Sequence, residues 1–294
     1  MESSYTDWAQ LIGLFVACAL VLGLLVGSFL NVVIYRLPLS MLAKWKTECE
    51  EFLREHQSDE PISDKDLNIV FPASHCPACK ADIKPWQNIP IVSYLFLKGK
   101  CANCKAHISI RYPLVELCTG LLSAFCIYHF GFSYEGGLAL VLTWALISLT
   151  MIDIDHQLLP DSITLPLMWM GLIANSFSVY TDLYSALFGA VFGYGILWAV
   201  YWLFKILTQK EGMGFGDFKL LAALGAWMGW QMLPLIIILS SLVGALIGIA
   251  GIIIQGRDKN IPIPFGPYLA IAGWIAFFWG EKITQIYLQF AKVA

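Results

Sequence analysis

Long stretches without a charged residue alternate with short polar segments along most of the chain. An α-helix needs about 20 predominantly apolar residues, within a range of about 17 to 25, to cross the hydrocarbon core of a bilayer. The pattern therefore predicts a series of membrane-spanning helices. The uncharged stretches cover residues 8–35, 117–134, 136–152, 162–181, 183–204, 220–256 and 261–280.

The stretch at 220–256 is too long for one membrane-spanning helix. Gly229, Gln231 and Pro234 are typical of a turn inside it. The turn predicts a short helix beginning near Asp217 and a second helix from about Met232, which brings the count to eight spans. We expect the first stretch to be a retained span, because no basic segment precedes it and it is too long for a signal-peptide core.

Composition and charge distribution agree with a membrane protein. Only 13% of the 294 residues are charged, against about 25% in a typical soluble domain. Residues 36–112 hold eleven of the 18 Lys and Arg residues, and five more flank later boundaries on the same predicted side. Only Lys282 and Lys292 fall on the other side. Because Lys and Arg gather in cytoplasmic loops, this segment is predicted to be cytoplasmic and the N-terminus to lie outside.

The cytoplasmic segment carries a pattern typical of a metal site. Its first part, 42–56, is expected to be an amphipathic helix near the membrane surface. Its second part contains two C-x2-C pairs, Cys76 with Cys79 and Cys101 with Cys104. Two such pairs at this spacing indicate a zinc ribbon, in which four thiolates complete a tetrahedral, structural site. The alternatives are two unrelated cysteine pairs or a redox C-x-x-C.

These features predict an all-α polytopic membrane protein with about eight transmembrane helices. A small cytoplasmic zinc-ribbon-like domain is expected between the first and second helices. The predicted limits are 1–36 for the first transmembrane helix, 37–112 for the zinc-binding domain and 113–294 for the transmembrane core. No nucleic-acid partner is expected, and the pattern does not predict an oligomeric state.

Two aspartates at predicted membrane edges are the main indication of chemistry, because acidic groups there are costly and usually functional. Asp153 ends one predicted span and Asp217 begins another, and the topology puts both at the cytoplasmic leaflet. Two close carboxylates do not both ionise readily, so one keeps a proton while the other activates water. Gly214 and Gly216 lack Cβ atoms and would let a substrate backbone approach closely. The pattern favours an aspartyl protease.

Other acidic residues have competing interpretations. Asp155 lies two residues after Asp153, about 200° around a regular helix, so only one of them can face Asp217. Asp161 is interpreted as the N-cap of the following helix. Glu116 either complements the helix dipole in the first turn of the second span or contacts a substrate or cofactor.

At these residues the chain resembles the prepilin peptidases, the type IV leader peptidases of the GxGD membrane aspartyl protease group. The resemblance implies that Asp153 and Asp217 are the catalytic pair and that the four cysteines bind zinc. It covers essentially the whole chain. The segments that carry it are 27–33 (GSFLNVV), 36–38 (RLP), 111–116 (RYPLVE), 152–155 (IDID), 159–161 (LPD), 214–217 (GFGD) and 262–267 (PIPFGP), with the cysteine tetrad.

The resemblance also implies substrates and a second activity. The substrates would be prepilins and the pseudopilins of type II secretion, cut at the cytoplasmic face of the bacterial inner membrane to remove a basic leader. Family members then methylate the new N-terminal amine using S-adenosylmethionine. For this cofactor Gly99 and Lys100 are the candidate contacts, with a simple turn before Cys101 as the alternative, and Glu116 is the third candidate.

A proton-coupled transporter and an assembly scaffold with a zinc module are the rival hypotheses. Membrane aspartates also serve proton relays. However, the two halves show no convincing repeat of the kind that many carriers contain, and a zinc ribbon after the first span is unusual for a carrier. A scaffold would account for the zinc module but not for two acids at one leaflet.

Overall fold

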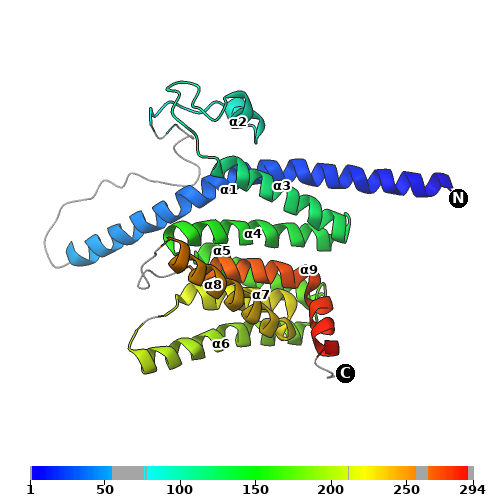
Figure 1. The fold of residues 1–294 in the computed structure, drawn as a ribbon, viewed down its shortest axis with the longest axis vertical. Coiled ribbons are helices and arrows are strands. Elements are labelled where there is room, and N and C mark those ends of the chain that lie inside the picture. The colour runs from blue at the N-terminus through cyan, green and yellow to red at the C-terminus, as the bar shows by residue number, and fades with distance from the viewer. Residues whose placement is uncertain (1, 55–75, 77, 211, 256–263, 291–294) are drawn as a thin grey trace. The chain divides into compact units, whose positions relative to one another are not determined.

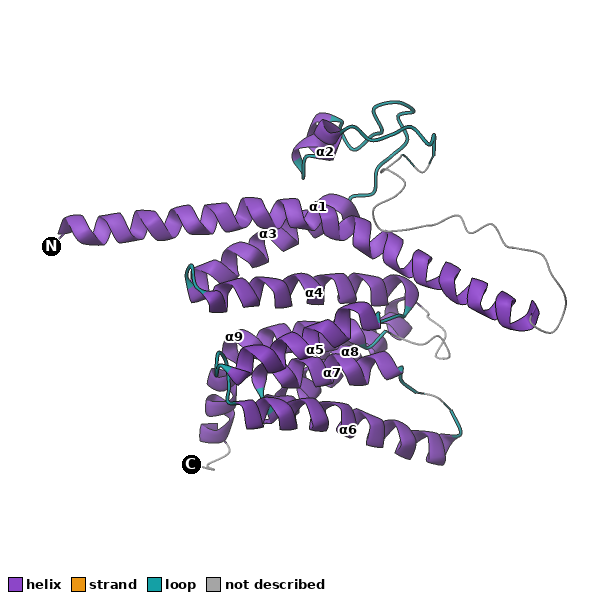
Figure 2. Cartoon of the chain, turned by 180° about the vertical axis from the view of Figure 1, so that it is seen from behind, coloured by secondary structure: helices purple, strands orange, loops and turns teal. Residues whose placement is uncertain are grey.

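The computed structural model of the chain describes residues 2–54, 76, 78–210, 212–255 and 264–290. Within these residues the fold is helical and contains no strand, apart from isolated bridge pairing between Lys100 and His107 (Figure 2). Two short 3-10 helices cover Pro85–Asn88 and Trp230–Met232. The α-helices are α1 (Glu2–Arg54), α2 (Val92–Phe96), α3 (Arg111–Phe130), α4 (Tyr134–His156), α5 (Asp161–Ser176), α6 (Leu183–Thr208), α7 (Phe215–Met228), α8 (Leu233–Gln255) and α9 (Gly266–Phe290). The predicted all-α fold is confirmed.

The chain divides into two compact units, 1–144 and 145–294, and the boundary lies inside α4. In the first unit, α1 packs along α3 (Figure 1). Small residues let the two backbones approach: a Cβ on Gly27 would lie 2.7 Å from the Glu116 Cα, and one on Gly23 would lie 2.8 Å from the Gly120 Cα. Close approach through small residues is the usual way in which helices pack within a membrane.

Helix α1 is longer than predicted, because 42–54 continues the first helix instead of forming a separate one. Pro38 lies inside this helix, although proline removes one backbone hydrogen bond. The residues after it favour helix, and two i,i+4 pairs follow, Lys44 with Glu48 at 3.8 Å and Lys46 with Glu50 at 3.7 Å. Such pairs contribute only about 0.2–0.5 kcal/mol each.

The second unit is built around α7, which contacts α5, α6 and α9. Nearly all of α7 is buried, from Asp217 to Met228 with the exception of Lys219. The buried Asn175 amide of α5 donates to the carbonyls of Ala226 and Trp227, at 2.8 and 3.0 Å, and so satisfies the end of α7. Neighbouring helices rather than lipid therefore surround this short helix.

The count of eight spans is not confirmed. Five helical segments among the described residues are long and apolar enough to cross a membrane, as in a multi-pass membrane protein. Helices α5 and α7 have only 16 and 14 residues, below the usual minimum of about 17. The predicted turn after α7 is confirmed: Gly229 ends α7 at a φ of +83°, and the 3-10 helix Trp230–Met232 leads into α8. The five segments are Ile12–Leu53, Arg111–Phe130, Tyr134–His156, Leu183–Thr208 and Trp230–Ala250.

Candidate active site and metal centre

Asp153 lies in the last turn of α4, and its side chain is buried, with 5% of its surface exposed. Its Oδ2 atom accepts a hydrogen bond of 3.0 Å from the backbone N–H of Gly266, the first residue of α9. Asp155, two residues on, is exposed. The two aspartates thus face different surroundings, as helix geometry predicts. The contact between Asp153 and Gly266 was not predicted. Gly266 does belong to the segment 262–267 that carries part of the family resemblance. The first two residues of that segment lie outside the described part of the chain.

Asp217 lies in the first turn of α7 and is also buried, with 7% of its surface exposed. Its backbone N–H donates to the Gly214 carbonyl at 3.2 Å, which closes the turn that leads into the helix. A Cβ on Gly216, next to Asp217, and one on Gly266, which bonds Asp153, would both meet the Leu159 side chain, at 2.7 and 3.2 Å. The structure therefore brings together, within one unit, two acids that are 64 positions apart in the sequence. Such a pair can share one proton and act as acid and base.

The two glycines before Asp217 differ in what surrounds them. A Cβ on Gly216 would lie 2.7 Å from the Leu159 Cβ, so the absence of a side chain there is explained by packing. A Cβ on Gly214 would meet nothing closer than the Asp217 Oδ2 at 3.8 Å. Gly214 alone of the two therefore leaves room beside an aspartate.

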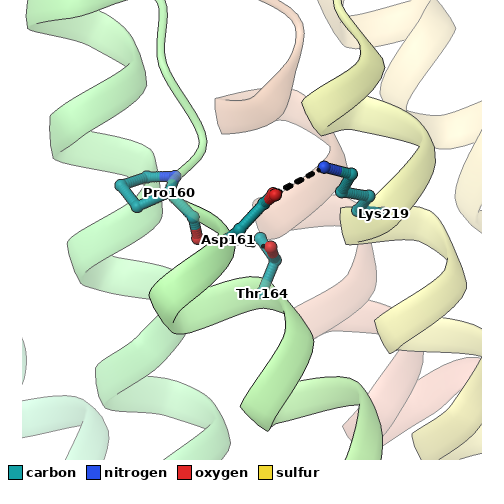
Figure 3. Close-up of polar contacts among 4 residues, drawn as sticks. All are labelled: Pro160, Asp161, Thr164 and Lys219. Atoms are coloured by element: carbon teal, nitrogen blue, oxygen red, sulfur yellow. Dashed lines mark hydrogen bonds and ion pairs between the residues drawn. The ribbon is translucent and has the colours of Figure 1, made fainter. Parts of the chain in front are cut away.

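The interpretation of Asp161 as an N-cap is wrong. Pro160 occupies the cap position of α5 without a side-chain cap bond, and Asp161 is the first helical residue. The Asp161 carboxylate instead pairs with Lys219 of α7, whose Nζ lies 2.7 Å from each carboxylate oxygen (Figure 3). The Pro160 carbonyl accepts from the backbone N–H groups of Ile163 and Thr164, both at 3.0 Å, and also from the Thr164 hydroxyl at 3.2 Å. The only signal for this ion pair in the sequence is the position of Lys219 two residues after Asp217.

The cysteine pairs form two knuckles with matching backbone geometry. In the first, the Cys76 N–H donates to the Ala81 carbonyl at 2.9 Å, and the Lys80 N–H donates to the Cys76 carbonyl at 2.8 Å. In the second, the Cys101 N–H donates to the Ala106 carbonyl at 2.8 Å, and the Lys105 N–H donates to the Cys101 carbonyl at 3.1 Å. The two lysines share a φ of 60°. The equivalence indicates two copies of one ligand-presenting turn.

The four Sγ atoms fit a tetrahedral zinc ion. They all lie within 4.8 Å of one another, and those of Cys76 and Cys104 are 3.8 Å apart. Zn–S bonds of about 2.3 Å in a tetrahedron place the sulfurs about 3.8 Å apart. Hydrogen bonds from the Ala81 backbone and the Asn103 side chain lower the pKa of Cys79 to about 6. At Cys104 the Ala106 backbone favours the thiolate, but desolvation and the neighbouring thiols outweigh it and raise the pKa to about 11. Four sulfurs this close can all be thiolates only when a cation neutralises their charge.

The candidate cofactor residues lie in the first unit, next to the second knuckle. Gly99 is buried in a turn with a φ of +67°, and a Cβ there would lie 2.9 Å from the Tyr94 hydroxyl. Lys100 is exposed and pairs through its backbone with His107. This geometry is the turn considered as the alternative, and a cofactor contact by these residues stays a prediction.

Glu116 lies in the second turn of α3, so the expectation of a first-turn charge complementing the dipole is wrong. The dipole effect falls off within the first turn. The side chain is buried, and its Oε2 atom accepts a 2.8 Å hydrogen bond from the Ile91 N–H. Ser28 of α1 also hydrogen-bonds this carboxylate. Glu116 therefore joins α1, α3 and the loop before α2.

The fold and the aspartate pair define a class of protein: a helical, multi-pass membrane protein with two buried acids held together inside one unit. The model of the bacterial peptidase A24 N-terminal domain matches residues 21–130, and that of the type IV leader peptidase family matches residues 140–249. The chain belongs to the type IV leader peptidase family.

Three curated relatives match nearly the whole chain, and all three are named prepilin leader peptidase/N-methyltransferase. The protein of Stutzerimonas stutzeri is 59% identical over 279 residues, which cover 95% of this chain and 96% of the relative. The protein of Pseudomonas aeruginosa is 59% identical over 277 residues, with 94% of each chain covered. That of Legionella pneumophila is 48% identical over 267 residues, which cover 91% and 92%. These matches do not favour the transporter or scaffold hypotheses. No solved structure matches the chain.

Proposed function

We propose that the chain is a membrane aspartyl endopeptidase that removes the basic leader from prepilins and pseudopilins, with Asp153 and Asp217 as its catalytic pair. The observation that carries the proposal is the burial of both acids, one bonded to Gly266 and one next to Gly216, two glycines that pack against the same Leu159 side chain. The names of the close relatives support prepilins as the substrate class.

The chemistry follows from a shared proton. The ionised member of the pair removes a proton from water, and the water oxygen attacks the scissile carbonyl. The protonated member donates to the carbonyl oxygen and the proton then passes to the leaving amine. The Gly266 N–H holds Asp153 in place, and the open side of Gly214 is where an extended substrate backbone would lie beside Asp217.

The proposal includes an orientation. Most Lys and Arg residues, including eleven in 36–112, lie on the side that also carries the aspartate pair in the predicted topology. That side is proposed to be the cytoplasm and the membrane to be the bacterial inner membrane. A basic leader held in the cytoplasm would then be within reach of the pair.

A second activity is proposed for the first unit, namely methylation of the new N-terminal amine by S-adenosylmethionine. Cys76, Cys79, Cys101 and Cys104 would hold a structural zinc ion, which keeps the two knuckles together and supplies no chemistry to the transfer. Gly99, Lys100 and Glu116 remain the candidate contacts for S-adenosylmethionine. The domain limits at residues 36 and 112 also stay predictions.

A cleavage assay tests the central assignment. Purified wild type, Asp153→Asn and Asp217→Asn are incubated in detergent with a prepilin, and mass spectrometry reads the products. Loss of the leader with wild type and no product with either variant is expected. Asp155→Asn is the matched control, because Asp155 lies on the same helix end but is exposed. Full cleavage by both variants of the pair would refute the mechanism.

A further inference from the structure

An exposed apolar surface lies on the segment that precedes the second cysteine knuckle. It consists of Trp86, Ile89, Val92, Leu95 and Phe96, which we call the α2 apolar face. Phe96 is 84% exposed and Leu95 is 68% exposed. Single exposed apolar residues are ordinary, whereas five within eleven positions mark a candidate contact surface.

The α2 apolar face is tied to the first turns of a membrane-capable helix. The Ile91 N–H donates to Glu116, which lies five residues after the start of α3. At 1.5 Å per residue, this contact is about 7.5 Å along the helix axis from Arg111. In both views α2 stands outside the place where α1 and α3 cross (Figures 1 and 2). The residue before α2 is therefore anchored to a helix that is long and apolar enough to cross a bilayer.

Basic residues border the same face. Lys84 precedes it, Lys98 and Lys100 follow it, and all three are exposed. Exposed Trp and Phe next to Lys are the composition of segments that lie in the membrane interface, where lysine is attracted to anionic headgroups. The three exposed lysines thus match the anionic headgroups of a lipid surface.

We propose that the α2 apolar face is embedded in the interface of a bilayer that contains anionic lipid. With Arg111 placed at the headgroups, the Ile91–Glu116 contact would lie about 7.5 Å below them, within the range of about 5–10 Å at which interfacial helices sit. The cysteine knuckles on either side of this segment are then held on the membrane surface at a fixed height, by α2 as well as by α1 and α3. This inference does not depend on the proposed catalytic activity.

The test is photocrosslinking of the full chain in nanodiscs of phosphatidylethanolamine and phosphatidylglycerol. The photoreactive residue p-benzoylphenylalanine replaces Phe96, and a matched variant carries it at the exposed Asp82 of the first knuckle. Mass spectrometry counts lipid adducts at each position. Roughly tenfold more lipid adduct at Phe96 than at Asp82 is expected from the difference between an embedded and a solvated side chain.

A measurement on the unaltered chain guards against misfolded variants. Wild type is reconstituted with lipids that carry a photoreactive group on the acyl chain, and labelled peptides are mapped. Labelling of 86–98 above the level of the knuckle peptide 101–106 supports the proposal. Equal labelling of the two peptides, or adducts at Phe96 to added prepilin or to a second copy of the chain but not to lipid, would overturn it.

Discussion

The ammonium group of Lys219 lies 2.7 Å from both carboxylate oxygens of Asp161. Asp161 follows Asp153 by eight residues, and Lys219 follows Asp217 by two. The ion pair therefore joins the start of α5 to the first turns of α7 and ties together the two chain segments that hold the buried acids.

Lys219→Met and Asp161→Asn should each reduce the kcat of prepilin cleavage with little change in stability. The two side chains are partly exposed, and exposed pairs contribute only about 0.2–1 kcal/mol to the free energy of unfolding. The rate is more sensitive, because a displacement of about 1 Å in a catalytic group can cost up to about 10²-fold. A loss of roughly tenfold is expected, measured with the melting temperature of each variant in detergent.

The exchanged variant, Asp161→Lys with Lys219→Asp, is the control for this pair. If the ion pair positions the acids, the exchange should recover most of the lost rate, whereas a purely structural role would leave the rate unaffected by any of the three variants. Single variants that cleave at the wild-type rate would remove the pair from the mechanism.

The sequence predicts the helices well because long uncharged stretches have few alternatives to a helix in a membrane. It predicts the aspartates because acidic groups at a membrane edge are costly. It predicts the cysteines because their two C-x2-C pairs have the spacing of a zinc site. It does not predict that α5 and α7 fall short of a full span, because the burial of α7 depends on the packing of α5, α6 and α9 around it. Nor does it predict the Gly266 and Lys219 contacts, which join positions 113 and 58 residues apart in the chain.

Gly266→Ala tests the contact that holds Asp153. The added Cβ would lie 2.7 Å from the Asp153 Oδ2 atom, so the carboxylate must move or the start of α9 must shift. Cleavage should fall by roughly tenfold or more, in line with the rate cost of displacing a catalytic group. The measurement is kcat for prepilin cleavage, with the expression level and melting temperature as checks on folding.

Gly195→Ala is the matched control for that experiment. Gly195 lies within α6, and nothing approaches a Cβ there within 4 Å. Alanine in a helix interior should raise the free energy of unfolding by about 0.5–1 kcal/mol and leave kcat unchanged. Equal losses of activity in the two variants would mean that the effect at Gly266 is not specific to Asp153.

Gly214→Ala and Gly216→Ala should behave differently, although both lie in the same short motif. At Gly216 the Cβ would collide with Leu159, and overpacking of this kind costs about 1–3 kcal/mol of stability. At Gly214 the Cβ meets only ordinary contacts, so the fold should be kept while KM for prepilin rises if the substrate backbone lies there. Thermal melting and Michaelis curves separate the two effects, and an unchanged KM for Gly214→Ala would exclude close substrate approach at this residue.

Removal of the zinc ligands should separate the two proposed activities. Cys79→Ser and Cys101→Ser each delete one of the clustered sulfurs, and a site with three thiolates should lose most of its metal, from about one zinc per chain to near zero. Methylation of cleaved pilin should be lost with it, because the knuckles adjoin Gly99 and Lys100. Cleavage should persist at a substantial fraction of the wild-type rate, because the aspartate pair belongs to the other unit.

Cys118→Ser, an exposed cysteine of α3 outside the cluster, is the control and should keep both zinc and methylation. Metal content by atomic spectroscopy and product mass give the readout, and a zinc-free variant that still methylates would show that the knuckles are not needed for that activity.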